Sequence, residues 1–210
     1  NKSKHGPKVQ LLNKSDMLLA NRRNLDIIKE VKLVSAYPKI NTCYESLTLA
    51  CYAVDILDSI AIHDDHYDEP YHLLSDYLDD LESSDGLLET KVKLSTKYIW
   101  DLISFLGYKP DLNTCSITNQ SRDYNQIPQY FDFANYFDPY HHESITKIPA
   151  GVFKILDAYD KGQSLSADLD TWIACLKLLN THLNHRLHKE FKSWRLVESL
   201  LGSANMAISL

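Results

Sequence analysis

The chain has 210 residues, of which 44% are hydrophobic, and this suits one domain of ordinary size or one domain with a small appendage. No run of eighteen apolar residues exists, and no apolar segment follows the basic start, so the sequence predicts neither a membrane span nor a signal peptide. The four cysteines are widely spaced and form no Cys-x-x-Cys. We therefore expect reduced thiols in an intracellular protein, with disulfide bonds as the alternative.

Charge is divided unevenly along the chain. Within the net charge of −6, residues 1–39 hold nine Lys/Arg and three Asp/Glu, whereas residues 41–90 hold thirteen Asp/Glu and no Lys or Arg. Residues 186–195 are basic again, with four cations against Glu190. Segregated charge of this kind indicates that the ends of the chain meet an anion; solvated faces are the alternative interpretation.

The first predicted element is a β-hairpin. Residues 9–19 and 25–37 are two apolar runs, the second partly alternating, and Asn21-Arg22-Arg23-Asn24 between them favours a turn. A hairpin alone is marginally stable in water. We therefore expect it to pack on the rest of the chain, or to belong to a sheet whose other strands precede residue 1. The chain does not begin with Met, which predicts a start inside a longer gene product.

Three helices are predicted next. Thr42-x-x-Glu45 is a capping-box pattern that begins an apolar stripe of helical period. Pro70, preceded by acidic residues, favours a second helix start. Gly107 suits the left-handed residue that follows a helix. These helices are expected at about 42–62, 70–82 and 87–106.

The second half of the chain begins without a clear period. Residues 108–147 hold seven aromatics between 124 and 140 and predict a functional loop or short strands. A helix is predicted at 149–159. The pattern at 166–201 predicts either one long helix or two helices with a joint near Lys189.

Three sets of residues contain side chains of the kinds that bind metals. Residues 63–69, His-Asp-Asp-His-Tyr-Asp-Glu, could serve a hard divalent cation, but seven adjacent residues cannot all converge on one ion, and a solvated loop is favoured. Cys115 with His141-His142-Glu143 matches no zinc spacing. A last set steps by three rather than four, so it either adds to a cationic face or has no role. This set is His182, His185 and His188.

The sequence favours binding over catalysis. It contains no Gly-x-Ser-x-Gly, no phosphate-cradling glycine loop and no Walker lysine, so we assign no catalytic residue, no metal and no cofactor. Cations around the predicted hairpin would neutralise phosphates without sequence preference. This first candidate group, for DNA binding, comprises Lys4, Lys8, Lys14, Arg22, Arg23, Lys29 and Lys32.

Three segments resemble the RecO family of bacterial recombination mediators. Leu106-Gly107-Tyr108-x-Pro110-x-Leu112-x-x-Cys115 resembles a helix end that leads to the first cysteine of the family's zinc insert. Tyr44-Glu45-Ser46-Leu47 resembles the first helix of its helical domain, and Phe191-Lys192-Ser193 followed by Arg195-Leu196 resembles its C-terminal Leu-Lys-Ser-Arg segment. The resemblance implies an α+β, mainly α fold. Residues 1–40 would form the C-terminal part of an OB-like β domain, and residues 41–210 a RecO-like helical domain with an irregular insert at about 108–147.

The chain departs from the family in three places. Zinc-binding members have Cys-x-x-Cys twice; here the first becomes Cys115-Ser116-Ile117-Thr118 and the second has no cysteine, so we predict no structural zinc. The family's His-Leu-Gly break is replaced by His185-Arg186-Leu187, which favours a continuous helix. About half of an OB-fold is absent from the N-terminus, and we expect weaker DNA binding from this chain as a result.

The resemblance implies a non-catalytic role in DNA repair and recombination. A RecO-like protein binds single-stranded DNA and the acidic, hydrophobic tail of single-stranded DNA-binding protein, works with RecR to load RecA, and anneals strands, in the bacterial cytoplasm and at the nucleoid. Two alternatives stay open: a helical protein-interaction module without a DNA role, and a metal-dependent hydrolase using residues 63–69. The second candidate group, for the tail or for DNA, comprises Lys91, Lys93, Lys97, Arg186, Lys189, Lys192 and Arg195.

Overall fold

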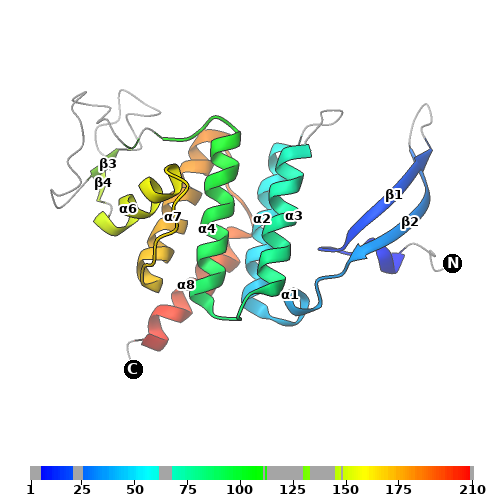
Figure 1. Cartoon of the computed structure of the whole chain (residues 1–210), viewed down its shortest axis with the longest axis horizontal. Coiled ribbons are helices and arrows are strands. Elements are labelled where there is room, and N and C mark those ends of the chain that lie inside the picture. Colours follow the sequence, from blue (N-terminus) through cyan, green and yellow to red (C-terminus); the bar gives the residue numbers. More distant parts are fainter. Residues whose placement is uncertain are drawn as a thin grey trace.

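The protein is mainly helical, with a small β-hairpin at its N-terminal end, as predicted (Figure 1). The structure, a computed structural model, describes residues 6–20, 26–61, 68–110, 112, 130–132, 145–147 and 149–208.

The predicted hairpin is confirmed, and it lies to one side of the helices (Figure 1). Strand β1 (Lys14–Ala20) pairs antiparallel with β2 (Ile27–Ser35), in a register that places Met17 opposite Val31. A short 3-10 turn, Gly6–Lys8, precedes β1. The first strand starts later than predicted because the chain turns between Gln10 and Asn13, with Leu12 in the left-handed region at φ 63°.

The helices that follow agree with the predicted pattern except at the first start. They are α1 (Pro38–Thr42), α2 (Tyr44–Ile60), α3 (Asp68–Ser83) and α4 (Leu88–Phe105). The predicted capping box is wrong: Thr42 belongs to α1, where its hydroxyl donates to the Pro38 carbonyl oxygen at 2.9 Å. Cys43 is instead the residue before α2, and it makes no side-chain cap hydrogen bond. Gly107 follows α4 at φ 72°, as predicted.

The second half contains two short strands and three helices. Strand β3 (Tyr130–Asp132) pairs antiparallel with β4 (Ile145–Lys147). The helices are α6 (Ala150–Asp160), α7 (Leu169–Leu187) and α8 (Trp194–Ile208).

The helix continues through residues 185–187 as expected, but it does not continue to residue 201, and the alternative of two helices with a joint near Lys189 is confirmed. Helix α7 ends at Leu187. The next residue, His188, is left-handed at φ 50° and lets the Lys189 N–H reach the Asn184 carbonyl oxygen. Phe191 then turns into the core, where it is 3% exposed. Tertiary burial of this aromatic side chain outweighs local helix propensity, which is why the helix breaks without a glycine.

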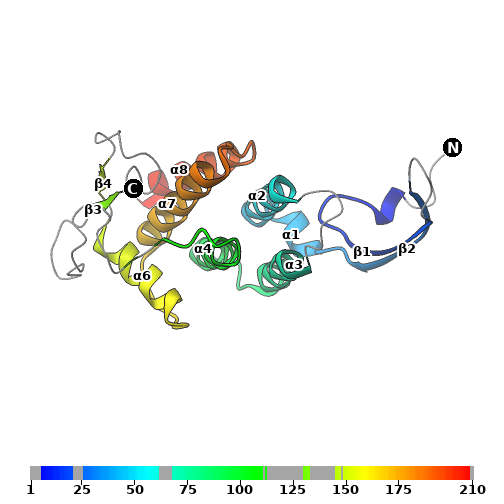
Figure 2. The same ribbon diagram turned by 90° about the horizontal axis from the view of Figure 1, so that it is seen from above.

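Helix α4 is the central element of the helical part. It packs against α3 and α2 on one side and against α7 on the other, and α6 packs on α7 (Figure 2). The inward residues predicted for α4, among them Val92, Ile99 and Ile103, are buried. None of the helices in the described ranges has the length and apolar content needed to cross a membrane.

Candidate nucleic-acid interface

Two lysines of the first candidate group have internal partners on the hairpin. Lys8 Nζ donates to the Val31 carbonyl oxygen at 2.9 Å and so ties the start of the described chain to β2. Lys14 Nζ donates to Ser75 Oγ at 2.5 Å and so ties the base of β1 to α3. Their ammonium groups therefore help to hold the hairpin in place.

The other members of this group divide into exposed and undescribed residues. Lys29 and Lys32 lie on β2 and are exposed to solvent. Lys4, Arg22 and Arg23 lie outside the residues that the structure describes. On the described part of the hairpin, Lys29 and Lys32 are thus the cations best placed to meet a phosphate.

Lys91, the first α4 member of the second group, is not a surface cation. It is 3% exposed, and its Nζ lies 3.6 Å from a carboxylate oxygen of Glu45 and 3.0 Å from Cys43 Sγ. Sequence spacing could not show this burial. A buried ammonium with its own partners cannot reach an acidic tail.

The next two lysines of α4 lie over aromatic rings. Lys93 Nζ is 5.8 Å from the centre of the Trp172 ring, and Lys97 Nζ is 5.7 Å from that of Tyr159. Lys97 also pairs with Asp101 one turn later at 2.5 Å. Because both rings are buried, they bind the lysines from within the core and are not available to stack against a base.

The clearest cationic surface lies where α7 passes into α8. We call this segment, residues 188–195, the α7–α8 corner. Lys189, Lys192 and Arg195 are all exposed there, and within the described ranges no ion pair involves them. Arg186 lies at its edge and is partly buried, with its guanidinium carbon 5.7 Å from the centre of the Tyr108 ring. A shallow hollow of about 270 Å³ adjoins the corner and is lined by Asn184, His185, His188, Lys189 and Glu190.

One carboxylate of α2 anchors this corner. Asp55 accepts hydrogen bonds from the Ser193 backbone N–H at 3.1 Å and from the Ser193 hydroxyl at 2.6 Å. A carboxylate at this point also complements the positive end of α8, which begins at the next residue. Lys192 and Arg195 flank the anchored serine. No local pattern identifies Asp55 as the partner, because it is one of thirteen acids in residues 41–90.

Aromatic packing holds the same segment from the inside. The Tyr52 ring lies 5.9 Å from that of Phe191 and 5.1 Å from that of Trp194, measured between centres. Its hydroxyl donates to Asn180 Oδ1 on α7 at 2.8 Å. Tyr52 of α2 therefore joins α7 and α8, and the segment that resembles the family's C-terminal motif is a packing motif as well as a basic one.

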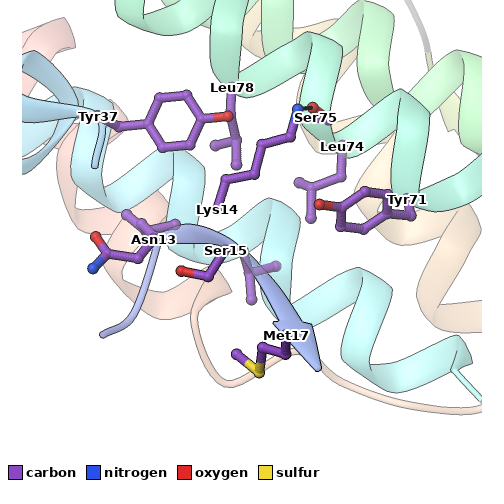
Figure 3. Close-up of a pocket in the computed structure, with 11 residues that line it drawn as sticks. Asn13, Lys14, Ser15, Met17, Tyr37, Tyr71, Leu74, Ser75 and Leu78 are labelled. Atoms are coloured by element: carbon purple, nitrogen blue, oxygen red, sulfur yellow. Dashed lines mark hydrogen bonds between the residues drawn. The ribbon is translucent and has the colours of Figure 1, made fainter. Parts of the chain in front are cut away.

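A second hollow, the junction pocket, lies between the base of β1 and helices α2 and α3 (Figure 3). Its volume is about 240 Å³. Burial, with the Asp79 carboxylate nearby, raises the pKa of Tyr37 to about 12, so this phenol stays protonated and able to donate at neutral pH. The lining residues are Leu12, Asn13, Lys14, Ser15, Met17, Tyr37, Val54, Tyr71, Leu74, Ser75 and Leu78.

The histidine set on α7 does not converge. His182 is 1% exposed, and its Nε2 lies 2.6 Å from the Tyr108 carbonyl oxygen. Burial first, with Arg186 and His185 adding to it, lowers the pKa of His182 to about 4, so the ring is neutral and structural. His185 and His188 are exposed.

The structure does not bring together a metal site from the part of the chain it describes: no group of three or more His, Cys, Asp or Glu side chains is suitably placed there. Most of the 63–69 cluster, together with Cys115 and residues 141–143, lies outside the described residues. The zinc ligands of the resembled family have no full counterpart in this sequence.

Comparison with known proteins gives two matches. A family model described as "Recombination protein O C terminal" matches residues 42–195. The chain is also 24% identical, over 190 residues, to a protein of Trichodesmium erythraeum (strain IMS101) named "DNA repair protein RecO". That alignment covers 87% of this chain and 61% of the relative, so the chain matches less than two thirds of the relative's length. Because the family model spans α2 to the start of α8, this chain belongs to the family of the recombination protein O C-terminal domain.

Proposed function

We propose that the chain acts without catalysis in DNA repair and recombination, and that it binds single-stranded DNA through the α7–α8 corner. The observation that carries this proposal is the corner itself. Lys189, Lys192 and Arg195 are exposed there, on a segment fixed by Asp55 and by buried aromatic rings. Rigidly held cations neutralise phosphates and release counterions, which favours binding without sequence preference.

We further propose that residues 1–40, which include the hairpin, are the C-terminal part of an OB-like β domain. Residues 41–210 then form the helical domain. The support is the exposure of apolar side chains on both strands. Leu18 is 57% exposed, Leu19 52% and Val34 50%. A two-stranded sheet with so much exposed apolar surface requires further strands or a partner to cover it. Lys29 and Lys32 would then extend the phosphate-binding surface onto that domain.

The test of DNA binding is fluorescence anisotropy with a labelled oligothymidylate, measured at several salt concentrations. The variant replaces Lys189, Lys192 and Arg195 with alanine; the matched control replaces Lys154 and Lys177, which are exposed on α6 and α7. Each phosphate contact on a single strand contributes about −0.7 to the slope of log K against log salt. We expect the slope of log K against log salt to be less steep by about 2 for the variant, and unchanged for the control. Equal slopes for all three proteins would reject the corner as the DNA site.

The partners belong to the same proposal. The acidic tail of single-stranded DNA-binding protein needs an apolar socket and nearby cations. The junction pocket offers the socket, but its lining cation, Lys14, is bound to Ser75, and the pocket adjoins α3, which carries six acidic residues and no Lys or Arg. The other candidate cations lie at the corner and at Lys93 and Lys97. The support from the structure is therefore stronger for DNA than for the tail. RecR, and RecA through it, are proposed as partners on family membership alone.

A labelled peptide with the tail's character, several Asp residues before a terminal Pro-Phe, tests this part. Binding that is salt-sensitive and lost when the terminal Phe is removed would support the tail as a partner. Competition with oligothymidylate would place both ligands on the corner. A chain that binds neither DNA nor peptide would favour the alternative, a helical protein-interaction module.

A further inference from the structure

A cluster of three reactive side chains lies at the start of α2, away from the corner. It consists of Cys43, Glu45 and Lys91, contributed by α2 and the facing helix α4. Lysine is rarely buried unless its charge is paired. Here the Lys91 side chain is 4% exposed, yet it directs its ammonium at the cysteine sulfur. The cluster is therefore a built feature of the interface between two helices.

The distances within the cluster are short. Lys91 Nζ donates to Cys43 Sγ at 3.0 Å, Cys43 Sγ donates to Glu45 Oε2 at 2.8 Å, and Lys91 Nζ lies 3.6 Å from the same carboxylate. Cys43 is partly exposed to solvent. It is also the residue just before the first turn of a helix of 17 residues, whose backbone N–H groups add positive potential.

Opposing effects act on the thiol. Burial and the Glu45 carboxylate raise the pKa of Cys43, but hydrogen bonds from Lys91 and Ser46 outweigh them, so the pKa is lowered overall. The other thiols in the described ranges differ. Burial raises the pKa of Cys51, and it raises that of the fully buried Cys175 still further. Thiolate character together with access is what distinguishes a reactive cysteine from a structural one.

We propose that Cys43, activated by Lys91, is a modification site for hydroperoxides, at which the sulfur is oxidised to a sulfenic acid. This function is separate from DNA binding and does not depend on it. The thiol gives up its proton to solvent water, and the thiolate held by the Lys91 ammonium attacks one oxygen of the peroxide. An S–O bond forms, the O–O bond breaks, and the departing hydroxide takes up a proton from solvent to become water. The peroxide is reduced and the sulfur oxidised, so Cys–SH and HOOH give Cys–SOH and H₂O.

The test treats the intact chain with hydrogen peroxide, traps sulfenic acid with dimedone and follows each cysteine by mass spectrometry. No Lys or Arg lies between residues 41 and 90, so trypsin would leave Cys43 and Cys51 on one peptide. A glutamate-specific protease, which cuts after Glu45, separates them. We expect Cys43 to be labelled about tenfold faster than Cys51, and Cys175 to stay unlabelled while the chain is folded.

The variant that isolates the mechanism is Lys91→Met, which keeps the length of the side chain and removes its charge. It should slow the labelling of Cys43 about tenfold, because the thiolate loses the ammonium that stabilises it. The matched control, Lys177→Met, alters an exposed lysine of α7 and should leave the rate unchanged. Circular dichroism checks that both variants fold. Labelling of Cys43 no faster than that of Cys51 in the unaltered chain overturns the proposal, as does an unchanged rate in a folded Lys91→Met variant.

Discussion

The bond between Asp55 and Ser193 gives the sharpest stability prediction. Asp55→Ala removes a carboxylate that accepts two hydrogen bonds, at 3.1 and 2.6 Å, from the residue before α8. Hydrogen bonds to charged groups contribute about 1.5–3 kcal/mol when buried. Because Asp55 is only partly buried, we expect a loss of about 2 kcal/mol for the pair, which corresponds to about 4–8 °C in Tm for a chain of this size. Ser193→Ala removes the hydroxyl alone and should cost about 1 kcal/mol.

Urea unfolding of a double-mutant cycle measures the interaction directly. Asp58→Ala is the matched control, since Asp58 is exposed on the same helix and should change stability by less than about 0.5 kcal/mol. We expect a coupling energy of about 1 kcal/mol between Asp55 and Ser193. Additive single variants would refute the claim that this bond fixes the α7–α8 corner. Fluorescence anisotropy tests the effect on function. Asp55→Ala should weaken DNA binding although it removes a negative charge.

Three further predictions concern stability. Tyr52→Phe leaves buried Asn180 Oδ1 without its donor and should cost about 1–2 kcal/mol in urea unfolding; no change would mean that the bond contributes nothing. The pKa of His182 is about 4 when folded, below its ordinary value, so the unfolded chain binds more protons below about pH 6.5, and stability falls as the pH falls toward 4. Between pH 7.5 and 5 the free energy of unfolding should fall by about 2 kcal/mol. The His182→Gln variant should lose less stability over the same pH range, and an equal loss would contradict the lowered pKa of His182. Gly107→Ala, at φ 72°, should lower stability by about 1 kcal/mol in a thermal melt, whereas an unchanged Tm would show that the position tolerates a side chain.

Much of the helical fold could be predicted because its signals are local. The stripe of α4 and the glycine that follows it are both visible in the sequence, and the structure confirms them. The short helix α1, which takes up Thr42 and so moves the start of α2, and the break after α7 could not be predicted in this way. Both depend on contacts between distant segments: Glu82 of α3 accepts from the backbone N–H groups of Lys39 and Ile40, and Phe191 is drawn into the core.

The candidate site was predictable in composition but not in arrangement. Charge counting identified the basic segment at residues 186–195, and the structure places Lys192 and Arg195 on its exposed side. Charge counting could not show that Lys91 is buried. Lys91 and Lys93 are indistinguishable in a helical pattern until the facing helix is known. The partner of Ser193 lies 138 residues earlier in the chain, at Asp55, and no local pattern records that pairing.

Tyr37 sets the direction in which the hairpin leaves the helices. It is left-handed, at φ 45° and ψ 63°, directly before Pro38, where a non-glycine residue is doubly disfavoured. Its ring is 1% exposed, and this burial offsets the backbone cost. The joint between the hairpin and the helices therefore holds one fixed angle and does not rotate freely. If a single strand of DNA contacts both β2 and the α7–α8 corner, the backbone conformation at Tyr37 sets the number of nucleotides between the two contacts. Tyr37→Gly would then make that number variable while leaving every cation in place.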